Sequence, residues 1–272
     1  MTPETAPRPR PYWHVDAKWI SGLLLAVIAG LTLAAYSLVL ATAEKPAVDT
    51  LSMALAVSLS GHGLDDETEI AVMRQRLEAA PGGQIQPIPG LNLTIRLEDL
   101  EGRTPRQARL ALFRQLAEPI YRTGGLTDLA MDPEMRAAVS SGVGVLSFFS
   151  LQTHQLLQRI FTILALVCLG LALPLIYFSF GPGRLTSPGC VLVVASLPGA
   201  AVLAFLGWVF NPPASTPEAG ADMTARLGAL ASEVLPPVAQ LMARAFLIAL
   251  ALGLILILLS VIGRLVFRRK RS

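Results

Sequence analysis

The sequence predicts a mainly α-helical integral membrane protein. It has four transmembrane helices, with an extracytoplasmic helix-rich (small α+β) domain between the first two spans. The 272-residue chain is 53% hydrophobic and only 15% charged, whereas an average soluble domain is about 25% charged. Four apolar stretches are each long enough to cross a hydrocarbon core of about 30 Å. Charge is also segregated. Residues 44–155 carry fourteen acidic and ten basic side chains, and residues 264–272 carry five basic side chains and no acidic one.

The sequence divides into eight expected segments. They are a disordered tail at 1–18, spans at 19–41, 157–180, 190–210 and 243–264, the polar domain at 44–155, a second polar loop with a short helix at 211–240, and a basic tail at 265–272. Basic residues of the N-terminal arm, Arg184 and the C-terminal tail fall on one side of these spans. The positive-inside rule therefore predicts that both termini are cytoplasmic.

The first span could be an anchor or a signal peptide. Trp13 and Trp19 bracket Lys18, a composition typical of the membrane interface. The residues Ala41, Thr42 and Ala43 resemble a signal-peptide cleavage site. However, the apolar run exceeds twenty residues, whereas the hydrophobic region of a signal peptide has about 7–15. An uncleaved anchor is therefore favoured.

The polar domain contains recognisable helix and strand signals. Acidic residues at 65–67 begin a helix that ends before Pro81, and the alternation in residues 91–97 predicts a strand. Thr104 and Gln107 form a capping box around Pro105. Residues 48–60 fit either a helix or a strand. The helix after Thr104 is expected to bend or end at Pro119, and its expected core residues are Ala108, Leu110, Leu112, Phe113 and Leu116.

Residues 133–180 are predicted to form one long helix that leaves the polar domain and enters the membrane. Asp132 is its expected N-cap and Pro133 its first residue. The apolar stretch 142–149 would project above the membrane, and cover by the chain's own domain is favoured over cover by a partner. This helix is the expected mechanical link between domain and spans. Its candidate partner-contact residues are Phe148, Phe149, Gln152, His154, Gln155 and Arg159.

The remaining segments predict turns and breaks. Residues 181–189 are expected to form a tight turn, and Pro198 with Gly199 to interrupt the third span. A short helix through about residue 230 is expected to precede Pro236 and Pro237. Cys168 and Cys190 lie at different depths, so no disulfide is expected. The basic tail is expected to contact anionic lipid headgroups, through Arg268, Arg269, Lys270 and Arg271.

Several kinds of chemistry are disfavoured. The spans hold no Asp, Glu, Lys, Arg or His between their ends, which argues against an ion-coupled pump or an intramembrane protease. His62 lies near Asp65 and Glu67, but clustered acids at a helix start favour helix capping over a metal site. No phosphate-binding loop, CxxC pair or HExxH motif is present. We expect no enzyme activity, cofactor, metal or nucleic-acid partner.

The order of spans and loops resembles, in topology alone, the permeases of mechanotransmissive and cell-division ABC transporters. No sequence motif accompanies this likeness, and the inner loop 181–189 is short for an ATPase docking surface. The preference for Arg, Ala and Leu suggests a bacterial inner-membrane protein. Its expected role is that of a subunit, assembly factor or anchor among other membrane protein subunits. The alternatives are a permease-like or signal-transmitting component and, least favoured, an enzyme that uses His62.

Overall fold

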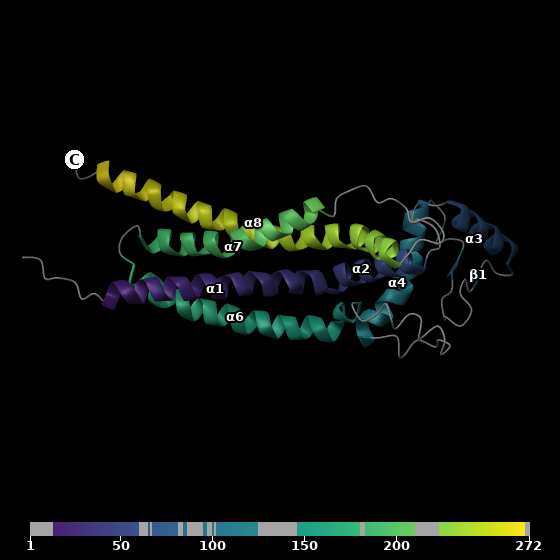
Figure 1. Ribbon diagram of the computed structural model, residues 1–272, viewed down its shortest axis with the longest axis horizontal. Helices are drawn as coiled ribbons and strands as arrows, with labels where there is room; N and C mark the ends of the chain where they lie inside the picture. Colours follow the sequence, from purple (N-terminus) through teal and green to yellow (C-terminus); the bar gives the residue numbers. More distant parts are fainter. Residues whose placement is uncertain are drawn as a thin grey trace, which may run out of the picture. The chain divides into compact units, whose positions relative to one another are not determined.

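The computed structural model describes residues 13–59, 65, 67–80, 84–85, 95–96, 100, 102–124, 146–179, 183–209 and 223–269. This part of the chain is mostly helical (Figure 1). Four helical stretches are long and apolar enough to cross a membrane, namely Trp19–Thr42, Leu151–Tyr177, Arg184–Leu206 and Ala231–Leu265. The protein is therefore a mainly α-helical, multi-pass membrane protein, as the sequence predicts.

Seven α-helices, one 3-10 turn and two short strands make up the described residues. They are α1 (Trp13–Thr42), α2 (Glu44–Leu59), α3 (Glu67–Ala79), β1 (Gln84–Ile85), β2 (Ile95–Arg96), α4 (Pro105–Thr123), η2 (Leu146–Phe148), α6 (Leu151–Tyr177), α7 (Gly183–Val209) and α8 (Met223–Arg269). The two strands pair antiparallel, with Ile85 opposite Ile95. Within the predicted strand 91–97, residues 95 and 96 are confirmed, and the others lie outside the described residues.

The chain divides into two compact units. Unit 1 comprises Met1–Ser37, Arg159–Val202 and Ala243–Ser272, and unit 2 comprises Leu38–Gln158 and Leu203–Met242. Unit 2 thus contains the polar helices α2, α3 and α4, together with one end of each of α1, α6, α7 and α8.

In unit 1, α1 contacts both α6 and α7. Toward α6, Thr32 Oγ1 lies 3.2 Å from Cys168 Sγ, and the rings of Tyr36 and Phe161 have centroids 5.3 Å apart. Toward α7, a Cβ added to Gly30 would lie 3.5 Å from the carbonyl oxygen of Ala195. The α6 span is the most exposed, with 6% of its most apolar window buried against 17–28% in the other three.

The contact between α7 and α8 in unit 1 is a close approach of backbones. A Cβ at Gly189 would lie 2.9 Å from the carbonyl oxygen of Gly253, and a Cβ at Gly199 would overlap the ring of Phe246. Thr186 and Ser260 add a hydroxyl–hydroxyl hydrogen bond of 2.6 Å between the same helices. Small residues in membrane helices permit such approach. These glycines therefore serve packing within the chain.

Unit 2 has a hydrophobic core in which α2 packs against α4. The capping box predicted at α4 is confirmed: Thr104 Oγ1 accepts from the N–H of Gln107, and Gln107 Oε1 accepts from the N–H of Thr104. The buried core residues are Ala47, Val48, Leu51, Leu55, Ala56, Ile70, Leu77, Leu100, Ala108, Leu112, Phe113, Leu116, Ala117, Ile120 and Tyr121. Four of the five predicted core residues of α4 are buried, and Leu110 is half-buried.

Several expected boundaries differ in the structure. Residues 13–18 of the expected disordered tail are helical. Residues 48–59, for which the sequence left helix and strand open, are helical. Pro119 does not end α4, which continues to Thr123 and closes on Gly124 in the left-handed conformation (φ 76°). Gly tolerates this conformation because it has no Cβ.

The breaks expected in the last two spans are also wrong. α7 begins at Gly183 and passes through Pro188 and Pro198, so most of the expected turn at 181–189 is helical. α8 runs without interruption through Pro236 and Pro237 (Figure 1). Proline keeps a φ compatible with a helix and removes a backbone donor, so it weakens a helix at one point without necessarily ending it. Cys168 and Cys190 are both free thiols, as predicted.

Candidate functional site

The start of α6 carries four of the six candidate partner-contact residues, and the other two, Phe148 and Phe149, lie just before it. The predicted helix from Pro133 does not reach α6 unbroken. η2 and a bend at 149–150 precede α6, which begins at Leu151. Ser150 caps it: Ser150 Oγ accepts from the N–H of Thr153 at 3.3 Å, and its carbonyl accepts from His154. A satisfied N-cap favours a helix start at this point over continuation from 133. Residues 125–145 lie outside the described part.

The six predicted residues divide into an inward and an outward group. Phe149 packs, half-buried, against the core of unit 2, which confirms that the chain's own domain covers this part of the apolar stretch. His154 is also half-buried. Phe148 is 40% exposed, and Gln152, Gln155 and Arg159 are exposed on α6. The prediction placed all six on one contact surface, whereas two of them point into the unit.

The inward group joins a hydrogen-bonded node at the end of α1. Tyr121 of α4 donates its hydroxyl proton to the carbonyl oxygen of Thr42 at 3.1 Å. Pro46, four residues after Thr42, has no N–H for that carbonyl, so the phenol supplies the donor. Thr42 Oγ1 donates to the Leu38 carbonyl oxygen at 2.8 Å and lies 3.2 Å from His154 Nδ1. The hydroxyl and the imidazole therefore form a hydrogen bond whose donor is set by the tautomer of His154.

This node, defined by Thr42, Tyr121 and His154, connects three helices inside unit 2. Thr42 is fully buried and Tyr121 nearly so. Burial raises the pKa of the Tyr121 phenol above its ordinary value, and the Glu44 carboxylate raises it further. The sequence gives no signal for this node, because its members lie far apart along the chain.

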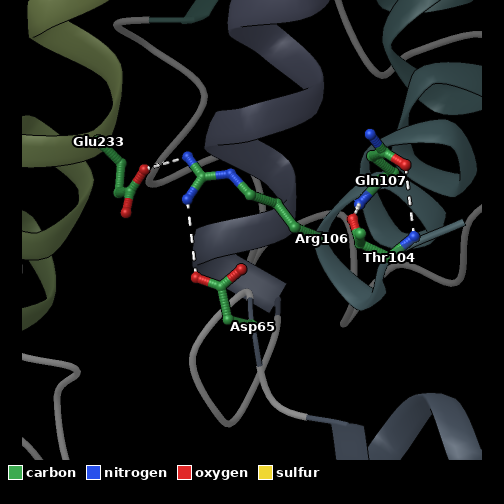
Figure 2. A network of polar contacts seen from close by, with 5 residues as sticks. All are labelled: Asp65, Thr104, Arg106, Gln107 and Glu233. Carbon is green, nitrogen blue, oxygen red and sulfur yellow. Dashed lines mark hydrogen bonds and ion pairs between the residues drawn. The ribbon is translucent and has the colours of Figure 1, made fainter.

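A second polar cluster involves the first turn of α4. Figure 2 shows Arg106 between Glu233 of α8 and Asp65, the residue two positions before α3, with the capping pair Thr104 and Gln107 alongside. Arg106 Nη2 lies 2.5 Å from Glu233 Oε2, and Nη1 lies 3.7 Å from Asp65 Oδ2. The three side chains are 35%, 23% and 78% exposed, respectively. Asp65 was expected only as a helix-capping residue, and this contact was not predicted.

Arg109 is a buried cation on the apolar stripe of α4. Its relative exposure is 2%, and its Nε is a buried atom without a hydrogen-bond partner, although the side chain has other interactions. Residues 109, 112, 116 and 120 recur at helical spacing, so the pattern places Arg109 on the buried face. This periodicity was the signal that could have identified it.

Other predicted sites fall outside what the structure describes. His62 lies outside the described residues, and within the described ranges no three His, Cys, Asp or Glu residues come together as a metal would require. Arg268 and Arg269 belong to the last turn of α8, whereas Lys270 and Arg271 lie outside the described part. Their expected contact with lipid headgroups stays a prediction.

The chain matches no family model, no curated protein and no solved structure.

Proposed function

We propose that the protein is a non-catalytic bacterial inner-membrane protein that acts as a subunit, assembly factor or anchor of a membrane protein complex. Unit 2 would be its extracytoplasmic contact module. The observation that carries the proposal is the surface at the start of α6. Phe148, Gln152, Gln155 and Leu156 are exposed there, Leu156 to 57%. Phe149 and His154 hold the same segment against the rest of unit 2.

The start of α6 is held in place by its half-buried side chains and exposes aromatic, aliphatic and amide side chains. Such a surface is suited to binding another protein. Gln152, Gln155 and Leu156 recur at spacings of three and four, so they share one face of α6. Phe148 adds an exposed ring whose neighbour Phe149 packs edge-on against it, with centroids 5.7 Å apart. Aromatic residues contribute strongly to protein interfaces, and holding them in place lowers the entropy lost on binding.

Charge supports the proposed orientation. The N-terminal arm, Arg184 and the C-terminal tail are basic, and residues 44–155 have an excess of acidic over basic side chains. Cytoplasmic termini and an extracytoplasmic unit 2 satisfy the positive-inside rule. The bilayer would be the first partner, and neighbouring membrane subunits the second.

Photo-crosslinking in cells tests this proposal. A photoreactive amino acid at Phe148, Gln152 or Leu156 is expected to capture one defined protein, which also co-purifies stoichiometrically after mild detergent extraction. The matched control is Val72 of α3, also apolar and 45% exposed, which should not capture that protein. A monomer that yields lipid adducts alone from all positions would rule out the subunit role.

A second candidate function is a permease-like or signal-transmitting component. The node of Thr42, Tyr121 and His154 favours it, because hydrogen bonds tie α4 to the ends of α1 and α6. Under this proposal, a change at unit 2 reaches the spans through these contacts. Co-purification of an ATPase would favour this role over that of a passive anchor. The Tyr121→Phe variant should then lose activity in cells while keeping its partner.

A further inference from the structure

Arg106 is held by two carboxylates from different parts of unit 2. Glu233 lies in α8 and Asp65 precedes α3, and both approach the same guanidinium (Figure 2). The Glu233 contact is the shorter, at 2.5 Å against 3.7 Å, and Glu233 is the less exposed of the two acids. The contact with α8 is therefore the principal one.

The position of Arg106 within α4 costs the helix some stability. It is the second residue of α4, and the first turn contains no acidic side chain to offset it. A cation at a helix N-terminus opposes the macrodipole. The capping box satisfies the backbone at this end without any contribution from Arg106. Local helix stability thus gives no reason for an arginine here, whereas the contact with Glu233 does.

Glu233 lies next to the weakest point of α8. Pro236 and Pro237 follow it by three and four residues and cannot donate to the helical hydrogen-bond ladder. Such positions are where helices bend. The part of α8 that belongs to unit 2 ends at Met242, just beyond this pair. Val234 and Ala239 are buried on either side of the prolines.

We propose that Arg106, Asp65 and Glu233 form a releasable electrostatic latch. The latch holds the part of α8 before Pro236 near the start of α4, and Pro236–Pro237 is the flexure about which that part moves when the latch opens. Partly exposed ion pairs contribute little free energy, so this contact can open without unfolding the unit. The latch goes beyond the proposed function, since it requires no partner and can be measured on the isolated protein.

Hydrogen exchange of the full-length protein in detergent micelles tests the latch. In Glu233→Gln and in Arg106→Gln, the amides of residues 223–242 are expected to exchange about fivefold faster, which corresponds to about 1 kcal/mol. Combining the two changes should add no further increase. The charge swap Arg106→Glu with Glu233→Arg should restore most of the protection. High salt should accelerate exchange in the parent protein and leave Glu233→Gln unchanged.

The matched control is Arg114→Gln. Arg114 is on the same helix and pairs with Asp49 at 3.7 Å and Glu118 at 3.6 Å, so its loss should not change exchange in residues 223–242. The latch is overturned if Glu233→Gln leaves this segment unchanged, or if exchange rises equally throughout α2 and α4. The flexure is tested separately by Pro236→Ala with Pro237→Ala in the Glu233→Gln protein. Protection should return toward the parent value, and unchanged exchange would overturn that part.

Discussion

The helix pair α7–α8 of unit 1 and the pair α2–α4 of unit 2 are held together by different means. In unit 1, Gly189 meets Gly253 so closely that a single added carbon would lie 2.9 Å from a carbonyl oxygen. In unit 2, large side chains such as Leu51, Phe113 and Tyr121 fill the space between the helices. Lipid tails are as apolar as leucine, so burying large side chains between membrane helices gains little, and close backbone approach stabilises the contact instead.

The comparison extends to polar groups. In unit 1 the contacts between helices include short hydroxyl and thiol pairs, such as Thr186 with Ser260. In unit 2 they include ion pairs, such as Arg106 with Glu233. Charged pairs suit a region that water reaches, whereas neutral pairs suit a hydrocarbon environment. A substitution in unit 1 should therefore act mainly through close backbone packing, and one in unit 2 mainly through buried side chains or ion pairs.

The largest expected effect is the loss of a core side chain in unit 2. Leu51 is fully buried, and Leu51→Ala should lower the free energy of unfolding by about 2–5 kcal/mol, since it leaves a cavity. Chemical denaturation of the full-length protein in micelles, followed by circular dichroism, measures this. Leu169 of α6 is 64% exposed, so Leu169→Ala should change stability by less than about 0.5 kcal/mol. Equal losses of unfolding free energy in the two variants would contradict the difference described between the units.

The packing of unit 1 is tested by adding a side-chain carbon instead of removing one. Gly189→Ala adds a carbon where Gly253 and Ile257 already touch the backbone, and the resulting overpacking should cost about 1–3 kcal/mol. Gly170→Ala is the matched control, because nothing lies within 4 Å of a Cβ there. That variant should be neutral or gain up to about 1 kcal/mol through helix propensity. If both variants behaved alike, close packing would not be what holds α7 on α8.

Local patterns in the sequence predicted much of this fold. The four apolar stretches and the capping box at Thr104 are properties of neighbouring residues, and both are confirmed. Helix boundaries near proline were less predictable. Pro119, Pro198 and Pro236 all lie inside helices, because neighbouring turns keep the helix intact around one missing donor.

Contacts between distant residues could not be predicted. Nothing in the local sequence connects Arg106 with Glu233, 127 residues later, or Tyr121 with Thr42. The structure divides the candidate contact residues: Phe148, Gln152, Gln155 and Arg159 are exposed, whereas His154 faces Thr42. Their contact with a partner stays a prediction. Which side chains of a helix face inward depends on what the helix packs against, and His154 contacts Thr42, 112 residues earlier in the chain.

A smaller effect is expected at the N-terminus of α4, where a side chain accepts a hydrogen bond from the helix backbone. Thr104→Ala removes the acceptor for the Gln107 N–H and should cost about 1 kcal/mol. Thr104→Ser keeps a capping oxygen and serves as the control, with an expected change of a few tenths of a kcal/mol. The same denaturation measurement applies. A Thr104→Ala protein as stable as the Ser variant would show that tertiary packing alone holds the start of α4.

The last expected effect depends on pH and isolates a single group of unit 2. Tyr121→Phe removes the hydrogen bond to the buried Thr42 carbonyl and leaves that acceptor unsatisfied, which should cost about 1–3 kcal/mol at neutral pH. The pKa of Tyr121 is raised in the folded protein by burial and by Glu44, so the folded state holds the phenolic proton more tightly than the unfolded state. The stability from Tyr121 is therefore fully present below about pH 10, the pKa of an unperturbed tyrosine. It is lost as pH rises beyond that value.

Denaturation of both proteins between pH 8 and pH 11 measures this loss. The parent should become no more stable than Tyr121→Phe at the alkaline end. All other titrating groups are common to the two proteins, so a constant difference across this range would mean that the phenol is not buried against Thr42 as described.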